Sequence, residues 1–346
     1  MFRVGIIGCG RPRATTGATG FGMSHAHAVG YRQSPDCRIV ALADIKLDNA
    51  RAFQAEHGGD TLYADYREML ATEAPDIVSI CTWPHLHGEM VIAAAAAGVK
   101  AIHCEKPMSP TYGEAVRMVA ACEERGVQLT FNHQRRFGEP YRRAKELLRS
   151  GAIGPLRRLE ATCDNLFDWG THWFDMLCFY NDETPVKWVI GQIEGRGSRE
   201  IFGALVEGQG LSWFECENDV QGLLMTGYGA TGLINRLIGA EGTIEVGHSA
   251  EVPLRIRGRD DAGWRTVPVS EGLHGVEYVT RGVLDLVDAL KTGREPELAG
   301  RRALRATELI FATYESSRRR GRVELPLAVE DSPFLSMVES GALTTA

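Results

Sequence analysis

The feature that most constrains the fold is an alternation of short apolar runs and helix-like segments over residues 1–131. The apolar runs lie at 4–7, 39–43, 77–81, 101–104 and 127–131. Helix-like segments separate them at 23–34, 46–57, 87–97 and 111–125. Apolar runs without polar alternation are typical of parallel strands that are covered on both faces. The sequence therefore predicts an α/β domain with a doubly wound parallel sheet over residues 1–131.

The remainder of the chain, residues 132–346, has a different pattern. After a helix-like segment at 139–150, strand-like segments follow at 155–163, 186–195, 211–217, 221–228, 232–238, 243–247 and 254–257. One helix-like segment at 169–181 interrupts them, and two more close the chain at 276–293 and 301–321. Strands in series with glycine-rich turns predict an α+β domain with a large, mostly antiparallel open sheet. We expect this second domain to span residues 132–346.

A glycine motif follows the first apolar run. Residues 4–10 read VGIIGCG, but the third glycine of a G-x-G-x-x-G turn would fall at position 13, which is Arg13. In a Rossmann unit an acidic residue about 20 residues beyond the motif holds the ribose hydroxyls. Asp44, at the end of CRIVALAD, comes 34 positions after Gly10 but only 22 positions after Gly22. Gly22 therefore takes the place of the third glycine, and the motif carries an insert of nine residues.

Together Gly8, Gly10, Gly22 and Asp44 predict a dinucleotide site. The glycines permit a tight turn and a close approach of the backbone, and the N-terminus of the next helix offers free N–H groups to a pyrophosphate. Because Asp44 would repel a 2′-phosphate, the sequence favours NAD over NADP. We expect segment 11–21, which contains the nine extra residues, to fold over the phosphates or the mouth of the active site, with Arg11 or Arg13 near a phosphate.

A second segment of chemical interest is HCEKPM at 103–108, which ends the apolar run 101–104. Ligands of open α/β sheets bind beyond the carboxyl ends of the strands, so Lys106 is expected to project toward a bound substrate. An ammonium group there can stabilise a developing alkoxide. The alternative is a lysine that only extends its charged end into solvent from the end of a strand.

A third segment is FDWGTHWFDM at 167–176. On a helix, Asp168, His172 and Asp175 would share one face. An imidazole, with an ordinary pKa of about 6.5, is suited to removing a proton from a substrate hydroxyl, and a nearby carboxylate can orient it. The alternatives are that Asp168 caps the helix and that His172 is a core histidine.

Composition excludes several other classes of function. A formal net charge of −7 argues against a general nucleic-acid or anionic-membrane surface. The longest uncharged stretch of small and apolar residues, 91–99, is too short to span a membrane. The eight cysteines form no C-x-x-C pair and indicate reduced thiols in the cytosol. The His-x-His pairs at 25/27 and 85/87 point to different faces of a helix, so we expect no metal site.

These motifs, in this order, resemble one known family. GIIGCG, ADI, SICTWPHLH, CEKP and DWGTHWFD are similar to segments of the glucose–fructose oxidoreductase and inositol dehydrogenase family of NAD(P)-dependent oxidoreductases. The resemblance extends to LIGAEGTIEVG and the closing helices, and covers nearly all of residues 1–328. It implies hydride transfer between NAD and a secondary alcohol of a sugar, sugar derivative or cyclitol, in a homodimer or homotetramer paired through the sheet of the second domain.

The resemblance also implies roles for individual residues. Lys106 would contact the nicotinamide ribose and the substrate, with Glu105 beside it, His172 would accept the hydroxyl proton, and Asp168 would orient the substrate. Further residues implied to line the cofactor or substrate are Thr82, Trp83, His87, His133, Gln134 and Arg135.

Aromatic faces near the catalytic residues suit a sugar or cyclitol ring. Trp169 and Trp173 flank His172. Trp169 is expected at the substrate, whereas core packing is the favoured interpretation of Trp173. Two alternatives from other classes stay open: a glycoside hydrolase that retains NAD and acts by oxidation and elimination, and a non-catalytic NAD-binding sensor.

Overall fold

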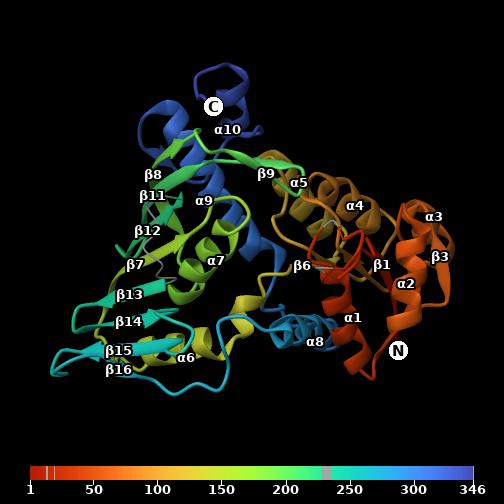
Figure 1. The fold of residues 1–346 in the computed structure, drawn as a ribbon, viewed down its shortest axis with the longest axis horizontal. Helices are drawn as coiled ribbons and strands as arrows, with labels where there is room; N and C mark the ends of the chain where they lie inside the picture. The colour runs from red at the N-terminus through yellow and green to blue at the C-terminus, as the bar shows by residue number, and fades with distance from the viewer. Residues whose placement is uncertain (13–14, 19, 228–234, 346) are drawn as a thin grey trace. The chain divides into compact units, whose positions relative to one another are not determined.

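The computed structural model describes residues 1–12, 15–18, 20–227 and 235–345 and divides into two compact units (Figure 1). The first unit comprises Met1–Pro110, Glu114–Gln134 and Val276–Leu304. The second comprises Thr111–Gly113, Arg135–Gly275 and Arg305–Ala346.

A six-stranded parallel sheet forms the centre of the first unit. Its strands are β1 (Phe2–Ile7), β2 (Cys37–Ala43), β3 (Thr61–Tyr63), β4 (Ile77–Ile80), β5 (Ala101–Cys104) and β6 (Gln128–Phe131). They lie in the order β3-β2-β1-β4-β5-β6, so the direction of winding reverses between β1 and β4. Such a reversal opens a crevice at the carboxyl ends of the strands, where ligands bind. The predicted doubly wound sheet is confirmed.

Helices cover both faces of this sheet (Figure 1). One core cluster joins the sheet to α1 (Met23–Gln33), α2 (Leu47–His57) and α8 (Val276–Thr292). The other joins it to α3 (Tyr66–Glu73), α4 (Pro84–Ala96) and α5 (Tyr112–Glu123). The strands are therefore buried on both sides, which explains their continuous apolar sequences.

The division of the chain differs from the predicted boundary between residues 131 and 132. Helix α8, expected in the second domain, packs on α1 in the first unit. The contact is close because Gly30 has no side chain: a Cβ there would lie 2.7 Å from Cβ of Val283. Val283, Leu286 and Val287 belong to the same core cluster as Val4. A helix far along the chain thus completes the core of the first unit.

A nine-stranded sheet forms the centre of the second unit. Its order is β16-β15-β14-β13-β7-β12-β11-β8-β17, and only β7 and β12 pair in parallel. The strands are β7 (Leu156–Cys163), β8 (Val186–Glu194), β11 (Gln209–Cys216), β12 (Gln221–Thr226), β13 (Asn235–Gly239), β14 (Gly242–Val246), β15 (Leu254–Gly258), β16 (Arg265–Thr266) and β17 (Val323–Glu324). A separate hairpin pairs β9 (Arg199–Ile201) with β10 (Ala204–Val206). The predicted large, mostly antiparallel sheet is confirmed, although residues 228 and 232–234 of the predicted strands lie outside the described residues.

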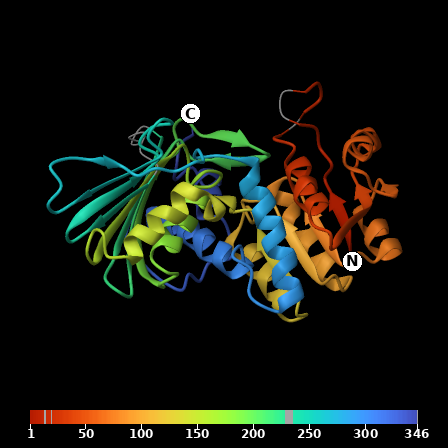
Figure 2. The same ribbon diagram turned by 90° about the horizontal axis from the view of Figure 1, so that it is seen from below.

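The helices of the second unit include α6 (Glu139–Arg149), α7 (Gly170–Tyr180), α10 (Pro333–Glu339) and most of α9 (Gly300–Arg319), preceded by the short 3-10 helix η1 (Gln134–Phe137). Figure 2 shows α6, α7 and α9 on one face of the sheet. Every residue of α7 is buried. On the other face the side chains of Leu211 and Trp213 of β11 are 44% and 39% exposed, as the alternation along a half-covered strand requires.

Two further properties concern the chain as a whole. All eight cysteines carry free thiols. Among the described residues, none of the helices has both the length and the apolar character that crossing a membrane requires.

Candidate active site

The glycine turn after β1 is held closed by close backbone contacts. Gly8, Gly10 and Gly22 have φ angles of 83°, 44° and 64°, a region that favours glycine. A Cβ on Gly8 would lie 2.6 Å from the carbonyl oxygen of Cys81, and one on Gly22 would lie 2.6 Å from that of Arg11. A Cβ on Gly10 would meet only Cα of Gly22, at 3.8 Å. The turn is thus tight at Gly8 and Gly22 and open at Gly10, where a phosphate can approach.

Asp44 ties this turn to the end of β2. Its Oδ2 accepts hydrogen bonds from the backbone N–H groups of Cys9 (3.0 Å) and Gly10 (3.2 Å), and its Oδ1 accepts one from Lys46 (2.8 Å). The carboxylate therefore lies beside the glycine turn, although Asp44 and Gly10 are 34 positions apart in the sequence.

The inserted segment runs from the turn toward α2. Arg11 donates from Nε to Oδ1 of Asn49 (3.0 Å) and from Nη1 to the carbonyl oxygen of Thr16 (3.1 Å). With Ile45 and Lys46 it lines a depression of about 560 Å³ next to Asp44. Arg13, the other arginine predicted near a phosphate, lies outside the described residues.

These residues fit a dinucleotide. No side chain caps the N-terminus of α1, whose N-cap is Gly22, so the backbone there is accessible to a pyrophosphate. Asp44 and the neighbouring depression would hold the adenosine ribose and its base.

A buried polar cluster lies at the carboxyl ends of β4, β5 and β6; we call it the Glu105 cluster, and it consists of Glu105, His27, Ser79 and Asn132. Oε1 of Glu105 lies 2.9 Å from Nε2 of His27 and accepts a hydrogen bond from Nδ2 of Asn132 (2.7 Å). Nδ1 of His27 lies 2.6 Å from Oγ of Ser79. All four side chains are buried. The cluster fixes the backbone that leads into Lys106.

The cluster keeps Glu105 ionised. Burial by itself would raise the pKa of this carboxyl, but the hydrogen bonds and charge of His27, with Asn132 and Lys106, outweigh burial and hold the pKa at about 2. Oε2 of this carboxylate also accepts a hydrogen bond from the backbone N–H of Lys106 (3.3 Å). Sequence reasoning identified Glu105 but not His27, Ser79 or Asn132, because their convergence follows from strand order rather than from spacing.

The residues after β4 differ in their surroundings. His87 is fully buried, with Nδ1 2.9 Å from the carbonyl oxygen of Pro107 and Nε2 3.1 Å from that of Thr82. Burial lowers its pKa. His87 thus links the loop after β4 to the loop that carries Lys106. Trp83 is 40% exposed, and the hydroxyl of Thr82 donates to the sulfur of Met90 (3.4 Å).

The two histidines of the first His-x-His pair diverge, as predicted. His27 joins the Glu105 cluster, whereas His25 meets Glu56 and His57 of α2. Nδ1 of His25 lies 2.8 Å from Nε2 of His57 and 3.3 Å from Oε2 of Glu56. The distance between the two nitrogens is that of an N–H···N hydrogen bond.

In the second unit, Asn165 holds the turn that precedes α7. Its Oδ1 accepts hydrogen bonds from the backbone N–H groups of Asp168 (2.6 Å) and Trp169 (3.3 Å). The N-cap of α7 is Trp169 and the helix has no side-chain cap, so Asp168 does not take the capping role that was its alternative. Asp168 lies in the turn before α7 and His172 lies in the first turn of the helix, and both are buried.

Asp175 has a different role from its neighbours on α7. Its carboxylate receives Nε and Nη2 of Arg136, both at 2.8 Å, and Nη1 of Arg136 donates to Glu183 (2.6 Å). Arg136 and Asp175 are both buried. This bidentate pair is a structural link between η1 and α7.

The neighbouring Arg135 is surrounded mainly by aromatic rings. Its Cζ lies 4.5 Å from the ring centre of Trp173 and 5.5 Å from that of Trp169, and Nη2 lies 3.4 Å from Nδ1 of His274. Burial, followed by repulsion from Arg135, lowers the pKa of His274 to about 4, so its ring is neutral near pH 7. His274 lies in a loop with no periodic pattern, so no signal in the sequence could have found it.

The remaining residues predicted to line the cofactor or substrate are divided between the two units. His133 and Gln134 follow β6 in the first unit, next to Asn132, and both are largely buried. Trp169, by contrast, is 36% exposed at the start of α7 in the second unit.

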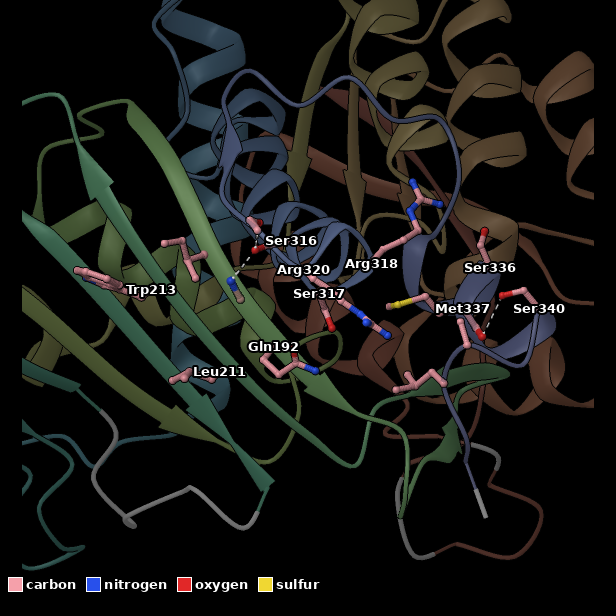
Figure 3. Close-up of a pocket in the computed structure, with 15 residues that line it drawn as sticks. Gln192, Leu211, Trp213, Ser316, Ser317, Arg318, Arg320, Ser336, Met337 and Ser340 are labelled. Atoms are coloured by element: carbon pink, nitrogen blue, oxygen red, sulfur yellow. Dashed lines mark hydrogen bonds between the residues drawn. The ribbon is translucent and has the colours of Figure 1, made fainter.

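A cavity of about 810 Å³ lies elsewhere in the second unit (Figure 3). It is bordered by β8, β11, the end of α9 and α10, and its lining includes Gln192, Trp213, Ser317 and Met337. None of the predicted catalytic or cofactor-binding residues is among the described residues that line it. Its size therefore does not mark the candidate active site, which rests on the chemistry of the residues described above.

Residues 2–133 match the model of the oxidoreductase family with an NAD-binding Rossmann fold, GFO_IDH_MocA. Over residues 2–133 the chain is thus similar to the Gfo/Idh/MocA family of oxidoreductases. The match spans the strands, the glycine turn and the Lys106 segment, so the prediction of an NAD-binding unit is confirmed.

Similar proteins are found over nearly the whole chain and over about half of it. A D-apiose dehydrogenase of Paraburkholderia graminis is 28% identical over 375 residues, which cover 99% of this chain and 94% of that protein. An inositol 2-dehydrogenase of Gluconacetobacter diazotrophicus is 35% identical over 162 residues, only 46% and 44% of the two chains. The fold is similar to that of a levoglucosan dehydrogenase in complex with NADH, with a TM-score of 0.79, 21% identity and coverage of 94% and 100%.

Proposed function

We propose that this protein is an NAD-dependent dehydrogenase that oxidises, reversibly, a secondary alcohol of a sugar, sugar derivative or cyclitol. The observation that carries the proposal is the position of Lys106 at the carboxyl end of β5, beside the reversal of strand order in an NAD-binding unit. The relatives named D-apiose dehydrogenase and inositol 2-dehydrogenase support the substrate class.

The chain's own residues supply proton transfer and charge stabilisation. His172 removes the proton of the substrate hydroxyl, and Asp168 orients the substrate. The ammonium group of Lys106 stabilises the alkoxide that develops as the proton leaves. Bound NAD supplies the hydride acceptor at C4 of its nicotinamide ring.

Asp44 supports NAD rather than NADP as the cofactor. Its carboxylate lies at the end of β2 beside the glycine turn, where the adenosine ribose binds in Rossmann units. A 2′-phosphate there would meet a second negative charge at short range.

We further propose a cytoplasmic homodimer or homotetramer that binds neither nucleic acid nor membrane. Support for a contact through the nine-stranded sheet comes from its open face, where Ile190, Leu211 and Trp213 are each between 39% and 44% exposed. The free thiols support a reducing compartment.

The test is the absorbance of NADH at 340 nm with a panel of sugars, sugar acids and cyclitols, in the presence of NAD or NADP. The proposal predicts NADH formation with at least one alcohol and a preference for NAD. Turnover of nitrophenyl glycosides without net NADH formation would instead identify a hydrolase, and tight NAD binding with no turnover of any alcohol or glycoside would identify a sensor.

A further inference from the structure

Arg135 is a buried cation whose hydrogen-bonding capacity the described residues use only in part. The residue is 4% exposed, and its Nε and Nη1 have no hydrogen-bond partner among the described residues. Its Nη2 lies 3.4 Å from Nδ1 of the neutral His274 ring. None of the ion pairs in the described part of the chain includes Arg135, although a charged group is costly to bury without an opposite charge.

The adjacent arginine shows that the fold can neutralise such a charge. Arg136, equally buried on the same 3-10 helix, is held by Asp175 and Glu183 through three hydrogen bonds of 2.6 to 2.8 Å. Two consecutive arginines therefore enter the interior of the second unit, one with two carboxylates and one with none.

The surroundings hold the guanidinium in place without neutralising it. The rings of Trp169 and Trp173 lie close enough for cation–π attraction, and Tyr141, which packs beside Trp173, hydrogen-bonds to the guanidinium. The titratable groups that act on Arg135 are Tyr141, Cys163, Asp168 and His274, and of these only Asp168 is ordinarily negative near pH 7. The charge of Asp168 favours the cationic form of the guanidinium.

The same aromatic residues place Arg135 near the proposed chemistry. Trp169 follows Asp168 directly, and Trp173 follows His172. A ligand group that uses the open N–H donors of Arg135 would therefore belong to the molecule that Asp168 and His172 handle.

We propose that Arg135 binds a carboxylate of the substrate, so that the natural substrate is an anionic sugar or polyol such as an uronate or aldonate. The inference rests on the proposed dehydrogenase function and narrows its substrate class. A planar guanidinium with open Nε and Nη1 donors matches the two oxygens of a carboxylate. A phosphate dianion would need more positive charge than one arginine beside Asp168 provides.

The experiment compares pairs of compounds that differ only in the carboxylate: D-galacturonate with D-galactose, D-glucuronate with D-glucose, and D-gluconate with D-glucitol. For each, kcat/KM for NADH formation and quenching of tryptophan fluorescence in the NAD-loaded protein are measured with wild type, Arg135→Gln and Arg135→Lys. The quenching of the chain's tryptophans, which include Trp169 and Trp173 beside Arg135, detects binding without turnover.

We expect the acid of at least one pair to be preferred by about 10-fold or more. Arg135→Gln should lower kcat/KM for that acid about 100-fold and that of its neutral counterpart less than about 3-fold, and Arg135→Lys should recover part of the loss. Sugar phosphates, tested in parallel, should be poor substrates.

Three results would overturn the inference: equal or better use of the neutral compounds, tighter binding of sugar phosphates, or an equal loss for acids and neutral compounds in Arg135→Gln. In each of these cases NADH formation still supports the dehydrogenase. If no alcohol is oxidised at all, the dehydrogenase proposal fails, and the quenching by acids against neutral sugars alone decides whether Arg135 binds a carboxylate.

Discussion

The two units each contain a buried charged cluster, and the clusters differ in whether the chain completes them. In the first unit, Oε1 of Glu105 lies 2.9 Å from Nε2 of His27 and accepts a hydrogen bond from Asn132, so groups of the chain itself surround the carboxylate. In the second, Arg135 has aromatic rings and a neutral histidine but no carboxylate of the described residues within ion-pairing distance. The completed cluster around Glu105 fixes the backbone that leads into Lys106, whereas the surroundings of Arg135 leave its Nε and Nη1 donors for a proposed ligand. Substitutions in and beside the two clusters can test this difference.

The largest effect is expected at the proposed catalytic residues themselves. Lys106→Met and His172→Gln should each lower kcat about 1000-fold, because one removes the charge that stabilises the alkoxide and the other the proton acceptor. Thermal unfolding should show little change in either variant. A reduction of less than about 10-fold in both would remove these residues from the catalytic role.

The next effect concerns the completed pair in the second unit. Arg136→Met should lower the free energy of unfolding by about 3 kcal/mol, because it leaves the buried carboxylate of Asp175 without its partner. Urea denaturation measures this value. Arg142→Met, at a neighbouring position on α6, is the control and should change stability by much less. Equal losses of unfolding free energy in the two variants would mean that the buried pair stabilises the fold no more than an exposed arginine does.

Glu105→Gln should lower the free energy of unfolding by about 2 kcal/mol at pH 7, since Gln cannot offer His27 a negative charge. The pKa of Glu105 is about 2 in the folded protein, below the ordinary value of 4.5. The stabilisation by this ionised group is therefore complete above about pH 4.5 and is lost as the pH falls toward 2. The stability difference between wild type and the variant should shrink over that range, and a difference independent of pH would contradict the ionised state of Glu105.

The smallest effect has the opposite sign. Arg135→Met should raise the free energy of unfolding of the ligand-free protein by about 1 kcal/mol, because it removes a buried charge that lacks a carboxylate partner while keeping most of the packing. Differential scanning calorimetry of wild type and variant provides the measurement. A decrease as large as that of Arg136→Met would show that Arg135 is an ordinary structural cation.

The first unit was largely predictable from the sequence because its strands are covered on both faces and leave continuous apolar runs. The exceptions are instructive. Strand β3 has only three residues, and α3, which follows it, was not predicted. Helix α8 was assigned to the second domain because the sequence shows its apolar face but not the glycine on α1 against which that face packs.

The candidate site was predictable where a motif has fixed spacing and not where topology brings residues together. Gly8, Gly22 and Asp44 follow from counting along the chain. His27, Ser79 and Asn132 come from one helix and the neighbourhood of two different strands, and only the strand order brings them to Glu105. The sequence does not show that Arg136 forms ion pairs and Arg135 does not. The carboxylates that pair with Arg136 belong to a helix and a turn much further along the chain.

The packing of Val283 against Gly30 bears on how the polypeptide matures during synthesis. Because residues 276–304 complete the first unit, a nascent chain cannot finish that unit when residues 1–131 leave the ribosome. The dinucleotide-binding unit stays incomplete, with one side of α1 uncovered, until residues 276–304 have been synthesised. Expression of residues 1–131 alone would therefore yield an aggregation-prone fragment, and a soluble half-molecule would need the late helix supplied in trans or fused to it.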